Sequence, residues 1–119
     1  MLFRSIDLAT EAHWRSVQSR EYAAYLELAV AARTDPELDT AFAPAAKRYD
    51  EVWIAEMIES FPQWKDQWEA MKLGSDFAIA VHSGLLMQGP VMGIERVEKV
   101  LRLTISTIRG LYEIGRAHV

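Results

Sequence analysis

Apolar residues recur at intervals of three and four positions along the whole chain, and no stretch alternates β-branched and polar residues between turn signals. Intervals of three and four are typical of amphipathic helices, whereas alternation marks a strand. The pattern therefore predicts an all-α fold, an antiparallel helical bundle of about five helices. We expect these helices near residues 6–17, 20–33, 36–61, 64–88 and 93–112.

Proline and glycine residues mark the expected helix boundaries. Asp35 is a suitable N-cap residue, and Pro36 suits the first position of the helix that follows it. Pro44 lies inside the third predicted helix and removes one backbone donor, so we expect it to kink or split that helix. Gly89 and Pro90 are expected to end the fourth helix.

The second predicted helix is apolar around most of its circumference. Its apolar residues include Tyr22, Tyr25, Leu26, Leu28, Ala29 and Ala32. Because a helix that is apolar on all sides is usually buried, we expect it to lie at the centre of the fold. Glu27 interrupts this helix, and two interpretations stay open: a solvated edge position, or a polar contact in a ligand pocket.

The last predicted helix has a wide apolar stripe with charged residues opposite. The stripe consists of Val97, Val100, Leu101, Thr104, Ile105, Ile108, Leu111 and Tyr112. It is wider than one flank of a small domain needs, and exposed apolar patches usually mark interfaces. We therefore expect a homodimer in which the last two helices pair with their copies through Leu85, Leu86, Val97, Leu101, Ile105 and Ile108.

Composition limits the partners. The 119 residues suit one domain, and a formal charge of −4 leaves no excess of Lys and Arg for a DNA backbone. The absence of cysteine excludes disulfides and thiolate sites and weakly favours a cytoplasmic location. No apolar stretch approaches the length of a membrane span.

No motif for catalysis, a metal or a cofactor stands out. Ser83 lacks the Gly-x-Ser-x-Gly context of a nucleophile, and no glycine-rich phosphate loop occurs. Neither His13 nor His82 has a ligand partner at the helical spacing that metal sites use, so packing or pocket lining is favoured for both. We therefore expect no enzyme activity.

Aromatic and methionine side chains are the richest chemical signal. They lie at helical spacings, and spacing alone favours a packed core. Tyr and Trp have polar tips that need partners when buried, and Met adapts its shape, so these residues also suit a cavity for apolar ligands.

Residues 26–38, LELAVAARTDPEL, resemble a segment that TetR-family transcriptional regulators carry early in their C-terminal domain. The order of elements after it also agrees: a long helix, a glycine-containing helix ending at residues 84–88, and a closing amphipathic helix. The resemblance implies a C-terminal-domain fold that binds an effector and pairs two subunits. In that family a separate N-terminal helix-turn-helix domain binds operator DNA, and no such domain is recognisable here.

The resemblance favours a pocket between the second, third and fourth helices for a small hydrophobic effector. We expect its ligand-binding residues among Tyr22, Tyr25, Trp53, Met57, Trp68 and Phe77. The alternative is a helical dimerisation module without a ligand, in which the same residues are simply core. An enclosed void of a few hundred cubic ångströms would favour the effector, and a solid core the module.

Both ends of the chain resemble translated sequencing-adapter DNA. The codons CTC TTC CGA TCT encode residues 2–5, and ATC GGA AGA GCA CAC GTC encode residues 114–119. We therefore predict that residues 1–5 and 114–119 are adapter-derived, and that the helical ligand-binding and dimerisation domain spans residues 6–113 of a fragment.

Overall fold

The computed structural model describes residues 2–117, with side chains over residues 4–113. The elements are α1 (Leu2–Val17), α2 (Arg20–Ala32), α3 (Pro36–Ser60), the 3₁₀ helix η1 (Pro62–Gln67), α4 (Trp68–Met92) and α5 (Ile94–Ala117). No strand occurs in residues 2–117, so the predicted all-α bundle of five helices is confirmed. The predicted adapter segments lie partly outside the described residues, and their origin stays a prediction.

The starts of α2 and α3 are set by side-chain caps. The Ser19 hydroxyl accepts a hydrogen bond from the Tyr22 N–H at 3.2 Å, and α2 begins there. The Asp35 carboxylate accepts from the Leu38 N–H at 3.1 Å, and Pro36 follows as the first residue of α3. These contacts satisfy backbone donors that a helix start leaves without partners.

The prolines do not end helices where the sequence led us to expect. α3 is continuous through Pro44, because the proline is exposed and water can reach the carbonyl that loses its partner. The expected end at Gly89-Pro90 is wrong, since α4 continues to Met92. Gly93 ends it instead, with φ of 83° and an N–H that donates to the Gly89 carbonyl at 2.9 Å.

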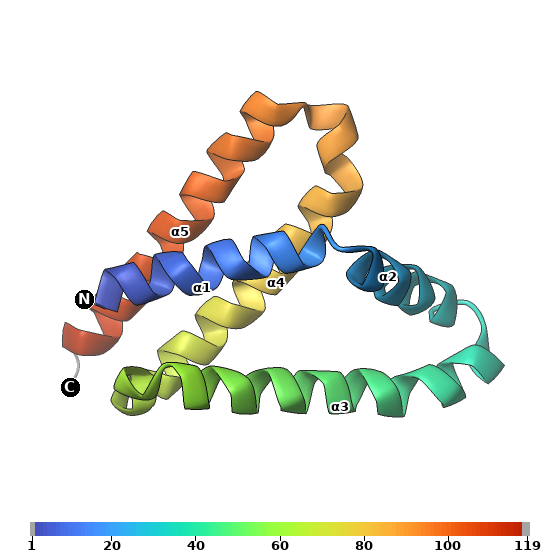
Figure 1. Cartoon of the computed structure of the whole chain (residues 1–119), viewed down its shortest axis with the longest axis horizontal. Coiled ribbons are helices and arrows are strands. Elements are labelled where there is room, and N and C mark those ends of the chain that lie inside the picture. The colour runs from blue at the N-terminus through green and yellow to red at the C-terminus, as the bar shows by residue number, and fades with distance from the viewer. Residues whose placement is uncertain (1, 118–119) are drawn as a thin grey trace.

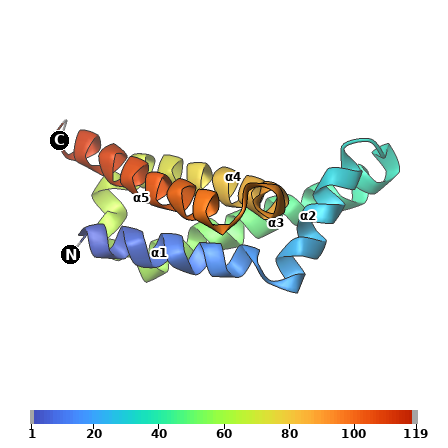
Figure 2. The same cartoon turned by 90° about the horizontal axis from the view of Figure 1, so that it is seen from above.

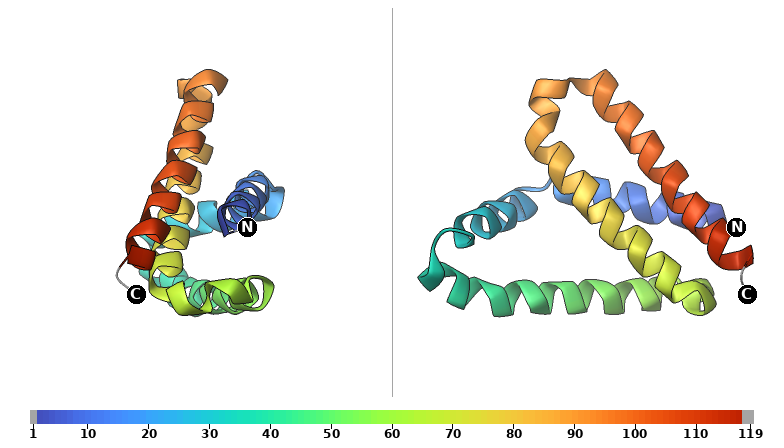
Figure 3. Two further views of the ribbon diagram at one scale, coloured as in Figure 1. Left: turned by 90° about the vertical axis from the view of Figure 1, so that its left-hand side faces the viewer. Right: turned by 180° about the vertical axis from the view of Figure 1, so that it is seen from behind.

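The helices are arranged around α4. Figure 1 shows α4 and α5 as a hairpin, α1 crossing α4, and α3 running in the direction opposite to α1. Figure 3 shows α1 and α3 on the same side of the layer that α4 and α5 form. Backbones pack closely where α4 meets α5 and α1 and where α2 meets α3, but α3 has no comparable backbone contact with α1 or α4. Large side chains therefore fill the space between α1, α3 and α4.

The expectation that the second helix is central is wrong. α2 packs mainly on α3 and projects with the start of α3 beyond the hairpin (Figure 2). Leu28 and Val30 on α2 are 46% and 44% exposed, whereas α4 holds five buried residues. The apolar circumference of α2 therefore includes a face that no other helix covers, and the central helix is α4.

The core joins α1, α3, η1, α4 and α5. Its buried members are Ile6, Met57, Trp64, Met71, Ala78, Ile108 and Tyr112. At Gly74 the hairpin helices approach so closely that an added Cβ would lie 3.1 Å from Ile108 Cγ2. The Arg109 guanidinium donates two hydrogen bonds to the Asp7 carboxylate, from Nε to Oδ1 at 3.2 Å and from Nη2 to Oδ2, and so ties α1 to α5.

The single chain leaves much surface uncovered. Its accessible surface is 8263 Å², about 1,700 Å² more than the roughly 6,500 Å² expected for a compact monomer of this mass. The radius of gyration is 15.5 Å, against about 13.5 Å for a compact domain of this length. In the part of the chain that the structure describes, no helix combines the length and apolarity needed to cross a membrane.

Candidate functional site

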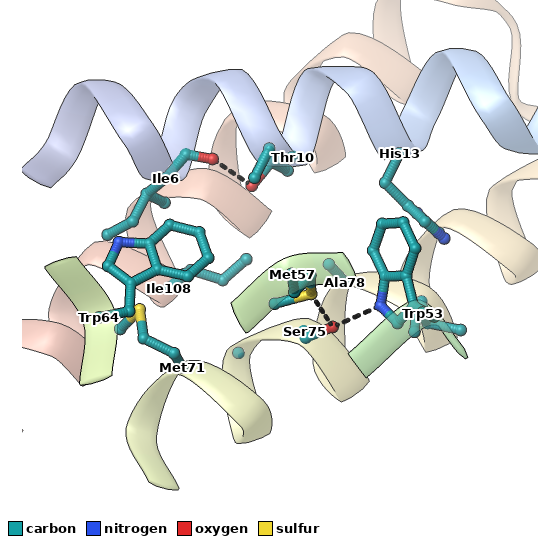
Figure 4. A pocket seen from close by; sticks show the side chains of 13 residues that line it. Ile6, Thr10, His13, Trp53, Met57, Trp64, Met71, Ser75, Ala78 and Ile108 are labelled. Carbon is teal, nitrogen blue, oxygen red and sulfur yellow. Dashed lines mark hydrogen bonds between the residues drawn. The ribbon is translucent and has the colours of Figure 1, made fainter. Parts of the chain in front are cut away.

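A small apolar cavity lies where α1, α3, η1, α4 and α5 meet. Its volume is about 40 Å³, room for roughly three water molecules. Figure 4 shows Ile6 and His13 of α1 pointing toward Trp64 and Trp53 across it. The lining comprises Ile6, Ala9, Thr10, His13, Trp53, Met57, Trp64, Met71, Gly74, Ser75, Ala78, Ile79 and Ile108. Most of it is apolar, with a few polar atoms near Ser75 and His13.

A second, aromatic pocket of about 80 Å³ adjoins this cavity. It is lined by His13, Tyr22, Tyr25, Tyr49, Asp50, Trp53 and Ile79, and three of these, His13, Trp53 and Ile79, also line the central cavity. Tyr49 and Asp50 are exposed, whereas Tyr22 and His13 are buried. The pocket therefore runs from an open, acidic mouth on α3 to a buried end beside the central cavity.

Hydrogen bonds of Trp53, Ser75 and Met57 connect α3 to α4. The Trp53 indole N–H donates to the Ser75 hydroxyl at 3.1 Å, and that hydroxyl donates to the Met57 sulfur at 3.3 Å (Figure 4). The contact satisfies the polar tip of the indole while its ring faces both cavities. Trp53 thus forms the wall between them.

His13 and His82 form a buried pair that joins α1 to α4. Their Nδ1 atoms are 2.8 Å apart, and their rings stack at 5.0 Å with 18° between planes. His13 is 6% exposed and His82 is fully buried. The short contact needs one protonated and one unprotonated Nδ1, so one ring donates the hydrogen bond and the other accepts it.

Burial sets the charge of this pair. Loss of water around the imidazole lowers the pKa of His13 from 6.5 to about 4. Burial and the neighbouring His13 lower the pKa of His82 to about 4. Both rings are therefore neutral at pH 7. The Nε2 atom of His82 is buried and has no hydrogen-bond partner among the described residues.

The tyrosines form a continuous aromatic cluster. Tyr25 stacks on Tyr49 with ring centres 4.9 Å apart and lies 5.8 Å from Tyr22. Burial raises the pKa of Tyr25, and Tyr22, Tyr49 and Asp50 raise it further. Burial, Tyr22 and Glu56 raise the pKa of Tyr49. Of the groups that raise these pKa values, the Asp50 and Glu56 carboxylates place negative charge near the cluster.

Four of the six expected ligand-binding residues line the two cavities. Trp53 and Met57 line the central one, and Tyr22, Tyr25 and Trp53 line the aromatic one. The other two lie elsewhere. Trp68 lines a surface hollow beside Phe61, and the Phe77 side chain is 37% exposed.

The sequence did not single out the polar lining residues Thr10, Ser75 and Asp50. Thr10 donates to the Ile6 carbonyl at 2.7 Å within its own helix, a common local contact with no periodic signal. Ser75 and Asp50 line the cavities only because α3 packs beside α4, and the sequence does not reveal that packing. His13 was singled out, because the lack of metal-ligand spacing favoured packing or pocket lining for both histidines, and His13 lines both cavities.

The residues expected at the dimer interface fall into two groups. Leu85 and Ile108 are each 5% exposed and pack inside the single chain. Leu86, Val97, Leu101 and Ile105 are half-buried, so their outer surfaces are open to a partner. Met87, Val91 and Ile94, around the turn of the α4–α5 hairpin, are the more exposed apolar residues nearby.

Neither the placement of possible metal ligands nor comparison with known proteins points to a function. Over residues 4–113, no group of three or more His, Asp or Glu side chains is placed to hold a metal ion. Comparison with known proteins gives no significant match to a family model, a curated protein or a solved structure.

The His13–His82 pair predicts that acid destabilises the fold well above the pH at which carboxylates titrate. Because each folded-state pKa lies near 4 and the unfolded value near 6.5, the unfolded chain binds more protons between these values. Stability should therefore fall from pH 7 to pH 5, by roughly 2 kcal/mol for each histidine.

Urea unfolding at pH 7, 6 and 5 measures this loss, and His82→Leu should about halve its slope. A stability that stays level from pH 7 to pH 5 in the unmodified chain would contradict the buried neutral pair.

Proposed function

We propose that the chain is the effector-sensing and dimerisation domain of a TetR-type transcriptional regulator, acting in the cytoplasm as a homodimer. The observation that carries the proposal is the pair of adjoining cavities between α1, α3 and α4, lined by Trp53, Met57 and the tyrosines. The resemblance of residues 26–38 to the TetR family supports it. Operator DNA would be bound only through an N-terminal domain of the parent protein, and the proposal assigns no enzymatic activity and no cofactor.

The cavity chemistry suits a small hydrophobic effector. An empty apolar void of about 40 Å³ costs a protein about 1 kcal/mol, which a filling apolar group recovers. Trp53 offers an aromatic face to both voids, and Met57 can adapt to the shape of a guest. Because α3 meets α1 and α4 through side chains and not through close backbone packing, a guest can widen the space by moving side chains.

Contacts of α1 provide a route by which an effector changes the rest of the molecule. His13 lines both cavities and bonds His82 of α4, while Asp7 of α1 pairs with Arg109 of α5. A ligand that displaces His13 therefore acts on both helices of the hairpin. In the parent regulator, α1 would carry this displacement toward the DNA-binding domain.

The uncovered surface supports the dimer. The excess of about 1,700 Å² over a compact monomer is roughly twice the 800 Å² or so that each partner buries in a standard protein interface. Half-buried Leu101 and Ile105 on α5 continue into the exposed residues Val91 and Ile94. A two-fold axis along the hairpin would cover these side chains with their own copies.

A dimerisation module without a ligand is the second candidate, and the size of the central void favours it. Pockets for drug-sized ligands measure roughly 300–1,000 Å³, far more than about 40 Å³. Under this alternative Trp53 and Met57 are ordinary core residues. Filling the void should then stabilise the protein without affecting any other property.

The effector proposal predicts that some members of a panel of small hydrophobic compounds stabilise the chain and quench its tryptophan fluorescence. At a free concentration 100-fold above Kd, binding should add about 2.7 kcal/mol, or roughly 10 °C in Tm. Ala78→Val adds two methyl groups at the cavity wall and should reduce this gain at least several-fold.

Ala80→Val places the same side chain on an exposed position of α4 and is the matched control. A broad panel that raises neither Tm nor quenching would favour the module without a ligand.

The dimer proposal predicts that the double substitution Leu101→Glu, Ile105→Glu yields monomers, because charges at half-buried positions of α5 cannot be covered by a partner. Sedimentation equilibrium from 5 to 200 μM measures the assembly. Lys99→Glu changes the net charge by the same −2 on the exposed side of α5 and should leave the dimer intact. An unmodified chain that stays monomeric over this range would refute the dimer.

A further inference from the structure

The aromatic pocket differs in charge from the central cavity. Three tyrosine rings and the Trp53 indole form its walls, and Asp50 lies at its mouth. None of the described residues that line it is Lys or Arg, although Lys47 and Arg48 precede Tyr49 on α3. Its one basic group, His13, is neutral at pH 7. The described pocket lining therefore presents negative charge and electron-rich ring faces and contains no charged cationic side chain.

We infer that the aromatic pocket binds the positively charged head of a small organic cation, a tertiary or quaternary ammonium group. This inference rests on the proposed effector-binding function and names the class of effector. Ring faces of Tyr and Trp carry partial negative charge and attract an ammonium group placed within about 6 Å. Asp50 adds a full charge beside them.

The ring geometry suits such a head group. Tyr25 and Tyr49 stack with centres 4.9 Å apart, Tyr22 lies 5.8 Å from Tyr25, and all three rings line the same pocket. The Tyr22 hydroxyl is hydrogen-bonded to Ser83 at 2.8 Å, which fixes its ring at the buried end. The volume of about 80 Å³ has room for roughly six water molecules, which is enough for the four heavy atoms of a trimethylammonium group.

The adjoining cavity defines the rest of the ligand. Because His13, Trp53 and Ile79 line both voids, a chain attached to the ammonium group passes Trp53 into the apolar cavity near Met57. That cavity of about 40 Å³ takes the first few carbons of an alkyl chain, and the rest of a six-carbon chain enters by moving side chains between α3 and α4. The effector is therefore an amphiphilic cation with a compact head and a short apolar tail.

Isothermal titration of the full chain with hexyltrimethylammonium, 1-hexanol and hexanoate tests this inference. The three probes share a six-carbon chain and differ in the charge of the head. The cation should bind at least tenfold more tightly than either of the others, and its binding should weaken as salt rises. Tryptophan quenching provides a second readout, because Trp53 lies beside both parts of the ligand.

Two substitutions locate the site. Asp50→Asn should weaken the cation three- to tenfold and leave 1-hexanol unchanged, whereas Glu51→Gln, an equal charge change next to it outside the pocket, should change neither. Tyr25→Leu should weaken the cation at least fivefold, and Tyr25→Phe, which keeps the ring, less than threefold. Asp50 is exposed, so Asp50→Asn folds and keeps the test decisive even if Tyr25→Leu does not fold.

The outcomes separate this inference from the proposed function. If 1-hexanol or hexanoate binds as tightly as the cation, or if Asp50→Asn matches Glu51→Gln, the cation site is refuted while an effector pocket remains. If none of the probes binds and the hydrophobic panel also fails, both the cation site and the effector function are refuted.

Discussion

The contact between His13 and His82 is the interaction on which the arrangement of the central helices depends. It is a hydrogen bond between two buried imidazoles, with Nδ1 atoms 2.8 Å apart. A hydrogen bond between the two Nδ1 atoms needs a proton on one of them and none on the other. The lowered pKa of each imidazole keeps both rings neutral at pH 7, so their tautomers are complementary. The pair holds α1 over α4 at the place where both cavities meet, because His13 lines each of them. The position of α1 beside the cavities and the response to acid are thus linked through this pair.

A second feature follows from the way α3 is attached. The α4–α5 hairpin packs backbone to backbone, with Gly74 against Ile108, whereas α3 reaches α4 through the side chains of Trp53, Met57 and Ser75. Large side chains bridge the distant backbones of α3 and α4, and the voids lie among them, with Gly74 and Ile108 of the hairpin lining the far side of the central one. The close-packed hairpin and the loosely bridged α3 are therefore the two parts that the proposed dimer and the proposed effector would use.

The sequence predicted local features well and relations between distant segments poorly. The cap at Asp35 and the five helices follow from residues within one or two turns of each other. The burial of α2 could not be predicted, because an apolar circumference is shared by buried helices and by helices with an uncovered face. Trp53 and Trp68 have the same chemistry and similar spacing, yet only Trp53 reaches the cavities, since that depends on how α3 lies beside α4. Pro90 lies inside α4, and the helix ends at Gly93, three residues later, where the backbone takes the positive φ that closes it.

The most direct test is the protonation state of the four ring nitrogens of His13 and His82, measured by long-range ¹H–¹⁵N correlation NMR at pH 7. The hydrogen bond requires that one Nδ1 carries a proton and the other does not, and the lowered pKa of each imidazole keeps both rings neutral. Each ring should then show one protonated and one unprotonated nitrogen, with opposite assignments in the two histidines. Identical tautomers in both rings would contradict the buried hydrogen bond, and an imidazolium signal from either ring would contradict the neutral pair and the acid sensitivity derived from it.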